Sequence, residues 1–378
     1  MPQEAVLRNA TIVLRDEVKT GAVLIRDGLI ADVSSSSAVG EDLDGDYLIP
    51  GLVELHTDHL EGHFSPRPGV RWNAIAAVQA HDAQIAASGI TTVFDCLRMG
   101  SDEDGGFDPQ EMRMLADAIE TAQGQGRLRA EHLLHLRCEV SSPDVLEALE
   151  RFRDDRSVRL ASLMDHAPGQ RQFQTMEQYT LYYKTKRGMS DEAFERYVAT
   201  RKEQSARYSG VHRKAIAEHC RDAGVTLASH DDATLAHVDE AITDGVRLAE
   251  FPTSLEAARA SHEAGMSVLM GAPNIVRGGS HSGNIAARDL ADAGILDVLS
   301  SDYIPSSLVH AAFLLADGER GLSLPDAVAL VTATPARTVG LDDRGEIATG
   351  KRADLVRIRH HHGLPTVRSV WRCGWRVT

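Results

Sequence analysis

The sequence predicts an α/β protein: a (β/α)8 barrel joined to a small β-sandwich domain that is built from both chain ends. Two observations support this fold. Between residues 51 and 302, eight short apolar runs typical of strands alternate with helical segments. Outside that region, both ends of the chain show short strand patterns. We therefore expect the barrel to span residues 51–342 and the small domain to comprise residues 1–50 and 343–378. A doubly wound sheet is the alternative, but no Gly-x-Gly-x-x-Gly motif follows a strand.

The small domain is predicted from strand-like segments at the two ends of the chain. Asp27-Gly28 is a strong hairpin signal, because a tight two-residue turn needs residues that tolerate positive φ. We expect the strands on either side of it to pair, and the two ends to come together in space. The segments span residues 5–14, 22–26, 29–33, 47–49, 353–358 and 367–377.

The barrel is predicted from the alternation of strands and helices. Its predicted strands span residues 52–56, 91–95, 133–140, 158–164, 226–229, 246–250, 267–270 and 298–301. Its predicted helices include residues 72–88, 109–123, 143–153, 211–223, 306–316 and 323–332. Residues 168–205 are polar, aromatic and basic, and we expect them to interrupt the alternation. Active-site residues should lie at the C-terminal ends of the strands.

The composition excludes several classes of function. The chain of 378 residues is 43% hydrophobic, and its 40 basic and 55 acidic residues give a net charge of −15. We expect no general binding to nucleic acid or to anionic membranes. No secretory signal or membrane-length apolar run is evident. The four cysteines are far apart and lack CxxC spacing, so we expect reduced thiols and a cytoplasmic protein. A homodimer is one option for the assembly of the protein.

The first predicted barrel strand leads into a candidate metal motif. The apolar run 52–55 is followed by His56 and Asp58. Because side chains alternate along a strand, these two point the same way. An imidazole and a carboxylate placed side by side are suitable ligands for a divalent metal, although a simple His–Asp hydrogen bond would also explain the pair.

Further polar residues follow the other predicted strands. Each alone can be explained as a helix cap or a loop hydrogen bond. In a barrel, however, these ends converge, and closely packed carboxylates would repel unless cations neutralised them. Two divalent ions fit this requirement; we expect zinc, with manganese or iron as alternatives. The residues are His56, Asp58, Asp95, Glu139, Asp165, His166, His230, Asp231, Asp232, Glu250 and Asp302.

We predict two metal sites that share a bridging ligand. His56, Asp58, Glu139 and Asp302 would hold one ion, and Glu139, His166 and His230 would hold the other. Glu139 is assigned as the bridge because it is the carboxylate at the end of its predicted strand; the alternative is a surface ion pair with Arg137. Asp302 is also the predicted catalytic residue, accepting a proton from the attacking water.

A glycine-rich segment, residues 271–284, suggests phosphate binding. Glycines allow backbone N–H groups to approach an anion, and Arg277 adds a bidentate partner, although a plain flexible loop is the alternative. Other cations lie in candidate mouth loops: Arg71, Arg98, Lys184, Lys186 and Arg187. His81 and His135 could contact substrate or be polar residues near the mouth. The predicted substrate and phosphate contacts are His63, Arg67, Arg137, Arg171, Arg277, Gly278, Gly279, Ser280 and His281.

These motifs together resemble the metal-dependent amidohydrolase superfamily and, within it, the PhnM-like enzymes of the carbon–phosphorus lyase pathway. The resemblance covers nearly the whole chain and lies in residues 50–58, 66–68, 87–93, 135–139, 163–173, 228–234, 270–284, 300–303 and 350–356. It implies hydrolysis of a phosphorylated small molecule, α-D-ribose 1-methylphosphonate 5-triphosphate or a related compound, to the 5-phosphate and pyrophosphate. Two alternatives stay open: a C–N hydrolase of the same superfamily (deacetylase, dihydropyrimidinase or deaminase), and a metal-free relative that serves in assembly.

The sequence departs from the pattern of this family at two positions. His59 stands where we expect an asparagine, and Gly62 stands where we expect a lysine or another polar residue. Both lie beside the His56–Asp58 motif and could influence the choice of substrate.

Overall fold

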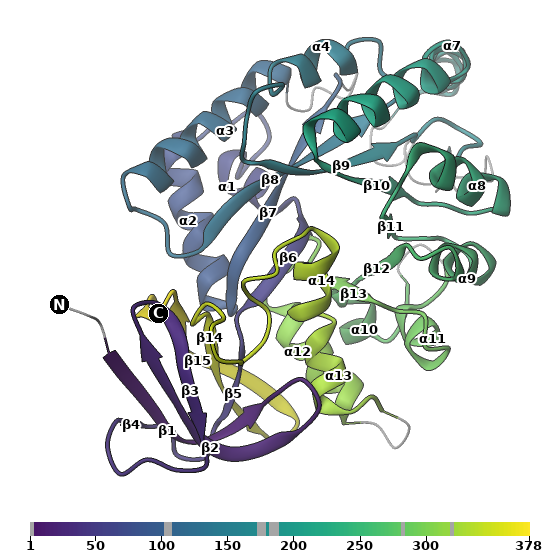
Figure 1. The fold of residues 1–378 in the computed structure, drawn as a ribbon. Coiled ribbons are helices and arrows are strands. Elements are labelled where there is room, and N and C mark those ends of the chain that lie inside the picture. The colour runs from purple at the N-terminus through teal and green to yellow at the C-terminus, as the bar shows by residue number, and fades with distance from the viewer. Residues whose placement is uncertain (1–3, 102–107, 172–178, 181–188, 281–283, 318–320) are drawn as a thin grey trace. The chain divides into compact units, whose positions relative to one another are not determined.

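The structure is a computed structural model that describes residues 4–101, 108–171, 179–180, 189–280, 284–317 and 321–378 (Figure 1). The chain divides into two compact units, which are described separately below. The first comprises Met1–Asp95, Ala118–Leu133 and Met270–Thr378, and the second comprises Cys96–Asp117 and Leu134–Leu269. The predicted domain boundaries near residues 50 and 343 stay a prediction.

Strands from both chain ends form one sheet in the first unit. Its order is β16-β15-β14-β5-β1-β2-β3, and β4 pairs with β1. Figure 1 shows β14 beside β5, where the two chain ends meet in an antiparallel pair. The expected union of the two ends is therefore present. The strands are β1 (Glu4–Val13), β2 (Val18–Arg26), β3 (Leu29–Ser34), β4 (Glu41–Asp42), β5 (Tyr47–Pro50), β14 (Leu355–His361), β15 (Leu364–Arg372) and β16 (Trp375–Arg376).

Local sequence explains this sheet. Asp27 and Gly28, with φ of 52° and 82°, form the predicted turn between β2 and β3. Alternate apolar side chains, among them Ile12 and Leu355, form a shared buried core. Gly51 follows β5 and allows a close approach, because a Cβ there would lie 2.2 Å from Oγ1 of Thr91.

The eight barrel strands that the structure describes have the order β13-β12-β11-β10-β9-β8-β7-β6. A parallel bridge between Thr57 and Asp302 joins the end of the first strand to the segment after the last. The predicted barrel and its eight strands are confirmed. The strands are β6 (Leu52–Thr57), β7 (Ile90–Met99), β8 (Glu131–Glu139), β9 (Val158–Met164), β10 (Thr226–His230), β11 (Leu248–Glu250), β12 (Ser267–Gly271) and β13 (Val298–Ser300).

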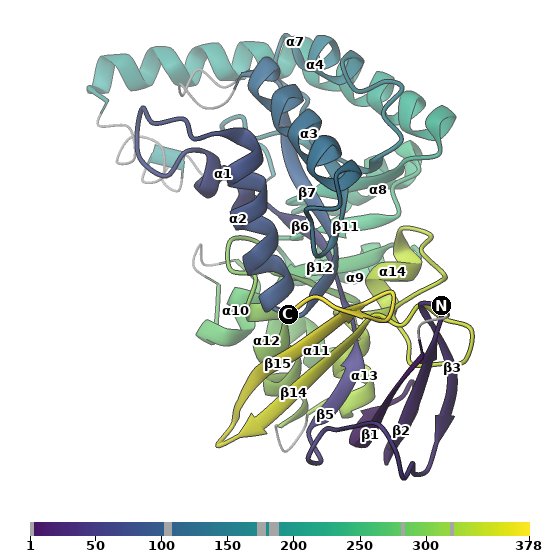
Figure 2. The same cartoon turned by 90° about the vertical axis from the view of Figure 1, so that its left-hand side faces the viewer.

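Helices follow most of these strands, and Figure 2 shows α1 beside α2. They are α1 (His59–Phe64), α2 (Ala74–Ala87), α3 (Pro109–Gly124), α4 (Val145–Glu150), α7 (Asp191–Ala223), α8 (Leu235–Asp244), α9 (Leu255–Glu263), α10 (Ala272–Arg277), α11 (Ala287–Asp292), α12 (Ser307–Ala316), α13 (Leu324–Ala329) and α14 (Ala333–Thr338). Among the residues described, no helix has the length and apolar character needed to span a membrane.

The largest error in the predicted elements concerns α7. Helix was expected from residue 211, but α7 begins at Asp191, where the Ser190 side chain accepts a hydrogen bond from the backbone N–H of Ala193. Its buried side includes Arg201, Ser205 and Arg213. Buried polar residues interrupt the apolar spacing that begins with Phe194 and Tyr197, so the sequence pattern did not reveal the start of the helix.

Two smaller differences affect the site. Strand β7 continues to Met99, so Asp95 lies within the strand and not at its end. The glycine-rich segment begins with α10, so part of the expected loop is helical. Outside the site, α13 and α4 lie within the predicted helices 323–332 and 143–153 but are shorter.

Candidate metal centre

In the first unit, backbone hydrogen bonds bring His56 and Asp302 together. The N–H of Asp302 donates to the carbonyl oxygen of His56 at 3.2 Å, and Oγ1 of Thr57 donates to the carbonyl oxygen of Asp302 at 2.8 Å. Asp58 precedes α1 but its side chain makes no capping hydrogen bond to that helix. His56, Asp58 and Asp302, three of the predicted ligands, thus belong to one local arrangement, and the Asp58 side chain does not cap α1.

A buried carboxylate, Glu54, supports this arrangement. It accepts hydrogen bonds from the backbone N–H groups of His56, at 2.6 Å, and Ser301. Burial raises the pKa of Glu54 to about 8, although both N–H groups act in the opposite direction. The Glu54 side chain therefore binds the backbone at two places: at His56 in β6 and at Ser301, the residue before Asp302.

Asp302 has an unusual backbone conformation. Its φ is 54°, in the left-handed region that few residues other than glycine, asparagine and aspartate adopt. Such conformations concentrate at functional sites, where the surrounding structure holds them. Asp231 of the second unit has the same feature, with φ of 57°.

A buried network of histidines and aspartates lies next to this motif in the first unit. Oδ1 of Asp95 lies 2.7 Å from Nε2 of His81, and its Oδ2 lies 2.7 Å from Nδ1 of His132. Asp82 lies 3.3 Å from Nε2 of His132 and also binds the Arg129 guanidinium at 3.0 Å. Burial would raise the pKa of Asp95, but His132 and His81 hold it well below its usual range. Burial lowers the pKa of His132, yet Asp95 and Asp82 together raise it to about 9.

Three histidines continue from this network toward α1. Nδ1 of His59 lies 3.1 Å from Nδ1 of His81, and the ring of His63 lies 4.7 Å from that of His59. Burial lowers the pKa of His59 to about 4 and also lowers the pKa of His63. His63 was a predicted substrate contact, and His81 is fully buried.

In the second unit, Glu139 lies at the end of β8 and is completely buried. Its Oε2 contacts Nδ1 of His166 at 2.7 Å, and Ser141 donates to its Oε1 at 2.7 Å. Arg98 and Arg201 lie 3.6 and 3.5 Å away. Burial would raise the pKa of Glu139, but His166 and these arginines hold it well below its usual range. The alternative of a surface ion pair with Arg137 is therefore wrong.

His166, His230 and Asp231 converge on one point. One ligand atom from each lies within 4.8 Å of the others. Oδ2 of Asp231 is 3.8 Å from Nε2 of His166 and 3.5 Å from Nε2 of His230. Within the described part of the chain this buried oxygen has no hydrogen-bond partner. A cation at this point would satisfy it, so the donor set fits a divalent metal.

The orientation of both imidazoles agrees with this fit. Nδ1 of His230 lies 3.2 Å from Oε2 of Glu250, as Nδ1 of His166 lies beside Glu139. Metal-binding histidines commonly direct their second nitrogen to a carboxylate in this way. Burial lowers the pKa of His230 to about 3, which keeps the ring neutral, as a metal ligand must be.

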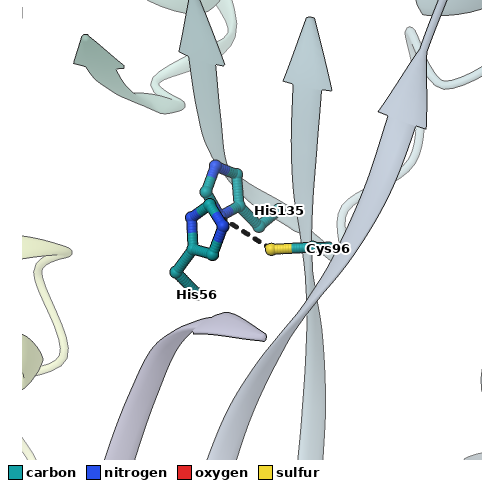
Figure 3. A group of neighbouring side chains, drawn as sticks. All are labelled: His56, Cys96 and His135. Carbon is teal, nitrogen blue, oxygen red and sulfur yellow. Dashed lines mark hydrogen bonds between the residues drawn. The ribbon is translucent and has the colours of Figure 1, made fainter. Parts of the chain in front are cut away.

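His135 is placed differently from a substrate contact. It is completely buried on β8, with Nδ1 3.4 Å from Sγ of Cys96 and Nε2 2.9 Å from Oγ of Ser162. Figure 3 shows the Cys96 thiol directed at the His135 ring. Both ring nitrogens of this histidine thus contact side chains of the neighbouring strands β7 and β9.

The predicted phosphate contacts are in varied surroundings. Arg67 and Arg277 are exposed, and Arg137 is half-buried. The N–H groups of Gly278 and Gly279 donate to carbonyl oxygens of α10, at 3.2 and 2.9 Å, so they are already used in its C-terminal cap. Arg277 and Ser280 are the better candidates in this segment. His281, Lys184, Lys186 and Arg187 lie outside the described residues.

Arg171 lies in the wall of a cavity of about 420 Å³ in the second unit. Its buried guanidinium pairs with Asp232 and, at 2.6 Å, with Glu240, so a phosphate there would compete with two carboxylates. Other groups lining the cavity are Asp165, Lys202, Ser205, Ser209 and Arg213.

Sequence reasoning missed the role of Glu54, and it placed Asp231 among the converging strand ends without assigning it as a ligand. Glu54 stands inside an apolar run, and that position of a charged residue was the available signal. A helix cap was the alternative explanation for Asp231, but Thr234 caps α8. Only its left-handed backbone, which the sequence does not display, turns it toward the histidines.

Comparison with known proteins agrees with this fold. The model of the amidohydrolase family matches residues 74–362, and the chain belongs to that family. The chain is similar to the α-D-ribose 1-methylphosphonate 5-triphosphate diphosphatase of Escherichia coli K12, with 48% identity over 98% of this chain and all of the relative.

Solved structures share the fold at low identity. The N-acetylglucosamine-6-phosphate deacetylase of Pasteurella multocida has a TM-score of 0.65 and 13% identity, covering 98% of this chain and 99% of that chain. The dihydropyrimidinase of Brevibacillus agri NCHU1002 has a TM-score of 0.60 and 15% identity, covering 99% of this chain and 95% of that chain.

Proposed function

We propose that this protein is a metal-dependent hydrolase that cleaves α-D-ribose 1-methylphosphonate 5-triphosphate, or a close ribose phosphonate triphosphate, in phosphonate catabolism. The products are the 5-phosphate and pyrophosphate. The observation that carries the proposal is the 48% identity, over 98% of the chain, to the E. coli diphosphatase that bears this substrate in its name. The buried ligand sets described above add the chemistry such a reaction needs.

Six residues would hold the metal ions. We assign His56, Asp58 and Asp302 to the first set and Glu139, His166 and His230 to the second. Of these, His166 and His230 each have a ligand atom within 4.8 Å of the other and of one from Asp231. Zinc suits imidazole and carboxylate ligands, and manganese or iron are alternatives. Bound divalent ions supply Lewis acidity that polarises a phosphoryl oxygen. The sharing of Glu139 between two ions rests on the sequence alone.

The reaction breaks the anhydride between the α and β phosphates. Water adds to phosphorus, the bond to the bridging oxygen breaks, and pyrophosphate leaves with that oxygen. The Asp302 carboxylate accepts the proton of the attacking water. Exposed Arg67 and Arg277 can bind the charge of the triphosphate, since guanidinium groups match phosphate geometry.

A C–N hydrolase is the alternative within the same family. Its support includes the fold shared with a dihydropyrimidinase and a deacetylase. At these sequence identities, a shared fold does not indicate a shared substrate. The C–N hydrolase alternative is therefore not favoured. The cytoplasmic location and the homodimer stay predictions.

Phosphorus NMR of the reaction tests the proposal. Wild-type protein with zinc should convert the triphosphate into equal amounts of the 5-phosphate and pyrophosphate. Release of inorganic phosphate as the first product would contradict it. Asp302→Asn is the matched control, because asparagine also tolerates the left-handed backbone of this position and should keep the fold while abolishing turnover.

A further inference from the structure

Three imidazoles outside the six assigned ligands gather at one place in the first unit. One nitrogen from each of His59, His63 and His81 lies within 4.8 Å of the others. His59 and His63 are four residues apart on α1, so their side chains lie on one helix face. His81 comes from α2, the helix beside it in Figure 2.

The distance between two of these nitrogens suits a shared ion. Nδ1 of His59 and Nδ1 of His81 are 3.1 Å apart. Two nitrogens bound to one tetrahedral zinc ion at about 2.0–2.1 Å would be separated by roughly 3.3–3.4 Å. The observed separation therefore lies within a few tenths of an ångström of the value for two ligands of one zinc ion.

A buried carboxylate orients the deepest of the three rings. Nε2 of His81 lies 2.7 Å from Oδ1 of Asp95, and neither side chain is exposed. With the Nε2 proton donated to Asp95, the lone pair of Nδ1 faces His59. A carboxylate behind the second nitrogen of an imidazole is a recurrent feature of protein zinc sites.

We propose that His59, His63 and His81 form an additional zinc site, with Asp95 orienting His81 and water completing the tetrahedron. His59 and His63 are half-buried, which leaves a route for the ion and the water. Imidazole nitrogens are suitable ligands for zinc and other late transition metals. The ion would fasten α1, which directly follows Asp58, to α2.

His59 makes this site a property of this chain. The PhnM-like pattern leads us to expect asparagine at this position, and asparagine would remove one of the three imidazoles. The competing explanation is a metal-free hydrogen bond between His59 and His81, in which one ring donates its Nδ1 proton to the other.

Zinc content of purified protein tests the site. Wild type, His59→Asn and His63→Ala are equilibrated with zinc, passed over a desalting column and measured by plasma mass spectrometry. Each variant should bind one ion per chain fewer than wild type. His361→Asn, an exposed histidine of the same unit, is the control and should bind as wild type does. This test uses only the difference in zinc content between wild type and each variant, so it does not depend on how many ions the six assigned ligands hold.

Equal zinc content in wild type and both variants would overturn the proposal, whatever the activity of the protein. A measurement on unmodified protein guards against variants that do not fold. An anomalous difference map at the zinc edge should place a peak among the rings of His59, His63 and His81. Absence of that peak in a crystal that contains zinc elsewhere would also overturn it.

Discussion

The backbone N–H of Asp302 donates a hydrogen bond to the carbonyl oxygen of His56 at 3.2 Å. This bond joins His56, near the end of β6, to Asp302, two residues after the end of β13. The position of the proposed catalytic carboxylate therefore depends on the strand that carries His56. Thr57 adds a second connection through its hydroxyl, at 2.8 Å from the carbonyl oxygen of Asp302.

Thr57→Val should lower kcat at least about tenfold, because small misplacements of catalytic groups are costly. It should also cost about 1 kcal/mol of stability, the typical net contribution of a hydrogen bond. Thr332→Val is a matched control, since Thr332 is equally buried and donates to the carbonyl oxygen of Val328 at 2.7 Å. The control should lose similar stability and keep its kcat. Equal kcat values for Thr57→Val and Thr332→Val would show that Thr57 does not position the catalytic carboxylate.

Glu139→Gln should reduce the metal content of the protein. It should also lower kcat, through a loss of at least about 3 kcal/mol of transition-state stabilisation, because a buried, preorganised charge is lost. In the structure Glu139 contacts His166 directly, so the variant also tests whether this carboxylate orients the imidazole. Glu131→Gln is the control: it lies at the start of the same strand and pairs with Arg344 and Arg352. Two bound ions and near-normal turnover in Glu139→Gln would place the bridge elsewhere.

Asp231→Asn should weaken metal binding by about 10–100-fold, a loss typical of residues that support metal ligands. Asparagine accepts the left-handed backbone at φ of 57°, so the loss would come from the charge and not from misfolding. Asp232→Asn is the adjacent control, because Asp232 pairs with Arg171. It should lower stability while leaving metal affinity intact. Unchanged affinity in Asp231→Asn would remove this residue from the metal centre.

His132 should make stability fall as pH rises. Its folded pKa of about 9 lies above the value of 6.5 for an unperturbed histidine, because Asp95 and Asp82 favour the charged ring. The stabilisation is complete below pH 6.5 and is lost between pH 6.5 and 9, by at most about 3 kcal/mol. Urea unfolding of metal-free wild type and His132→Gln at several pH values measures it. An unchanged difference between the two proteins across this range would refute the ionised network.

The sequence predicted the barrel strands well because each is a short apolar run with a polar residue after it. Strand β9 has the predicted bounds, and His166 and His230 lie at or just beyond strand ends, as expected. These features depend on local pattern. The first half of α7 does not, because its buried Arg201 and Ser205 bind polar partners, Ser141 and Asp165.

Other parts of the site required three-dimensional information. Asp95 was expected at a strand mouth, but it lies within β7 and orients His81 and His132. No sequence spacing links residue 132 to residue 95. The convergence of His59 with His81 likewise depends on the packing of α1 beside α2, since the two residues belong to different helices.

The most direct test of the central claim compares three substrates on one preparation. The protein is stripped of metal, reloaded with zinc, and assayed with a ribose 1-alkylphosphonate 5-triphosphate, with ATP and with an amide such as a dihydropyrimidine. We expect pyrophosphate release from the ribose phosphonate with the highest kcat/KM, dependence on added metal, and little turnover of the amide. Faster hydrolysis of the amide, or pyrophosphate release that persists without metal, would contradict the account.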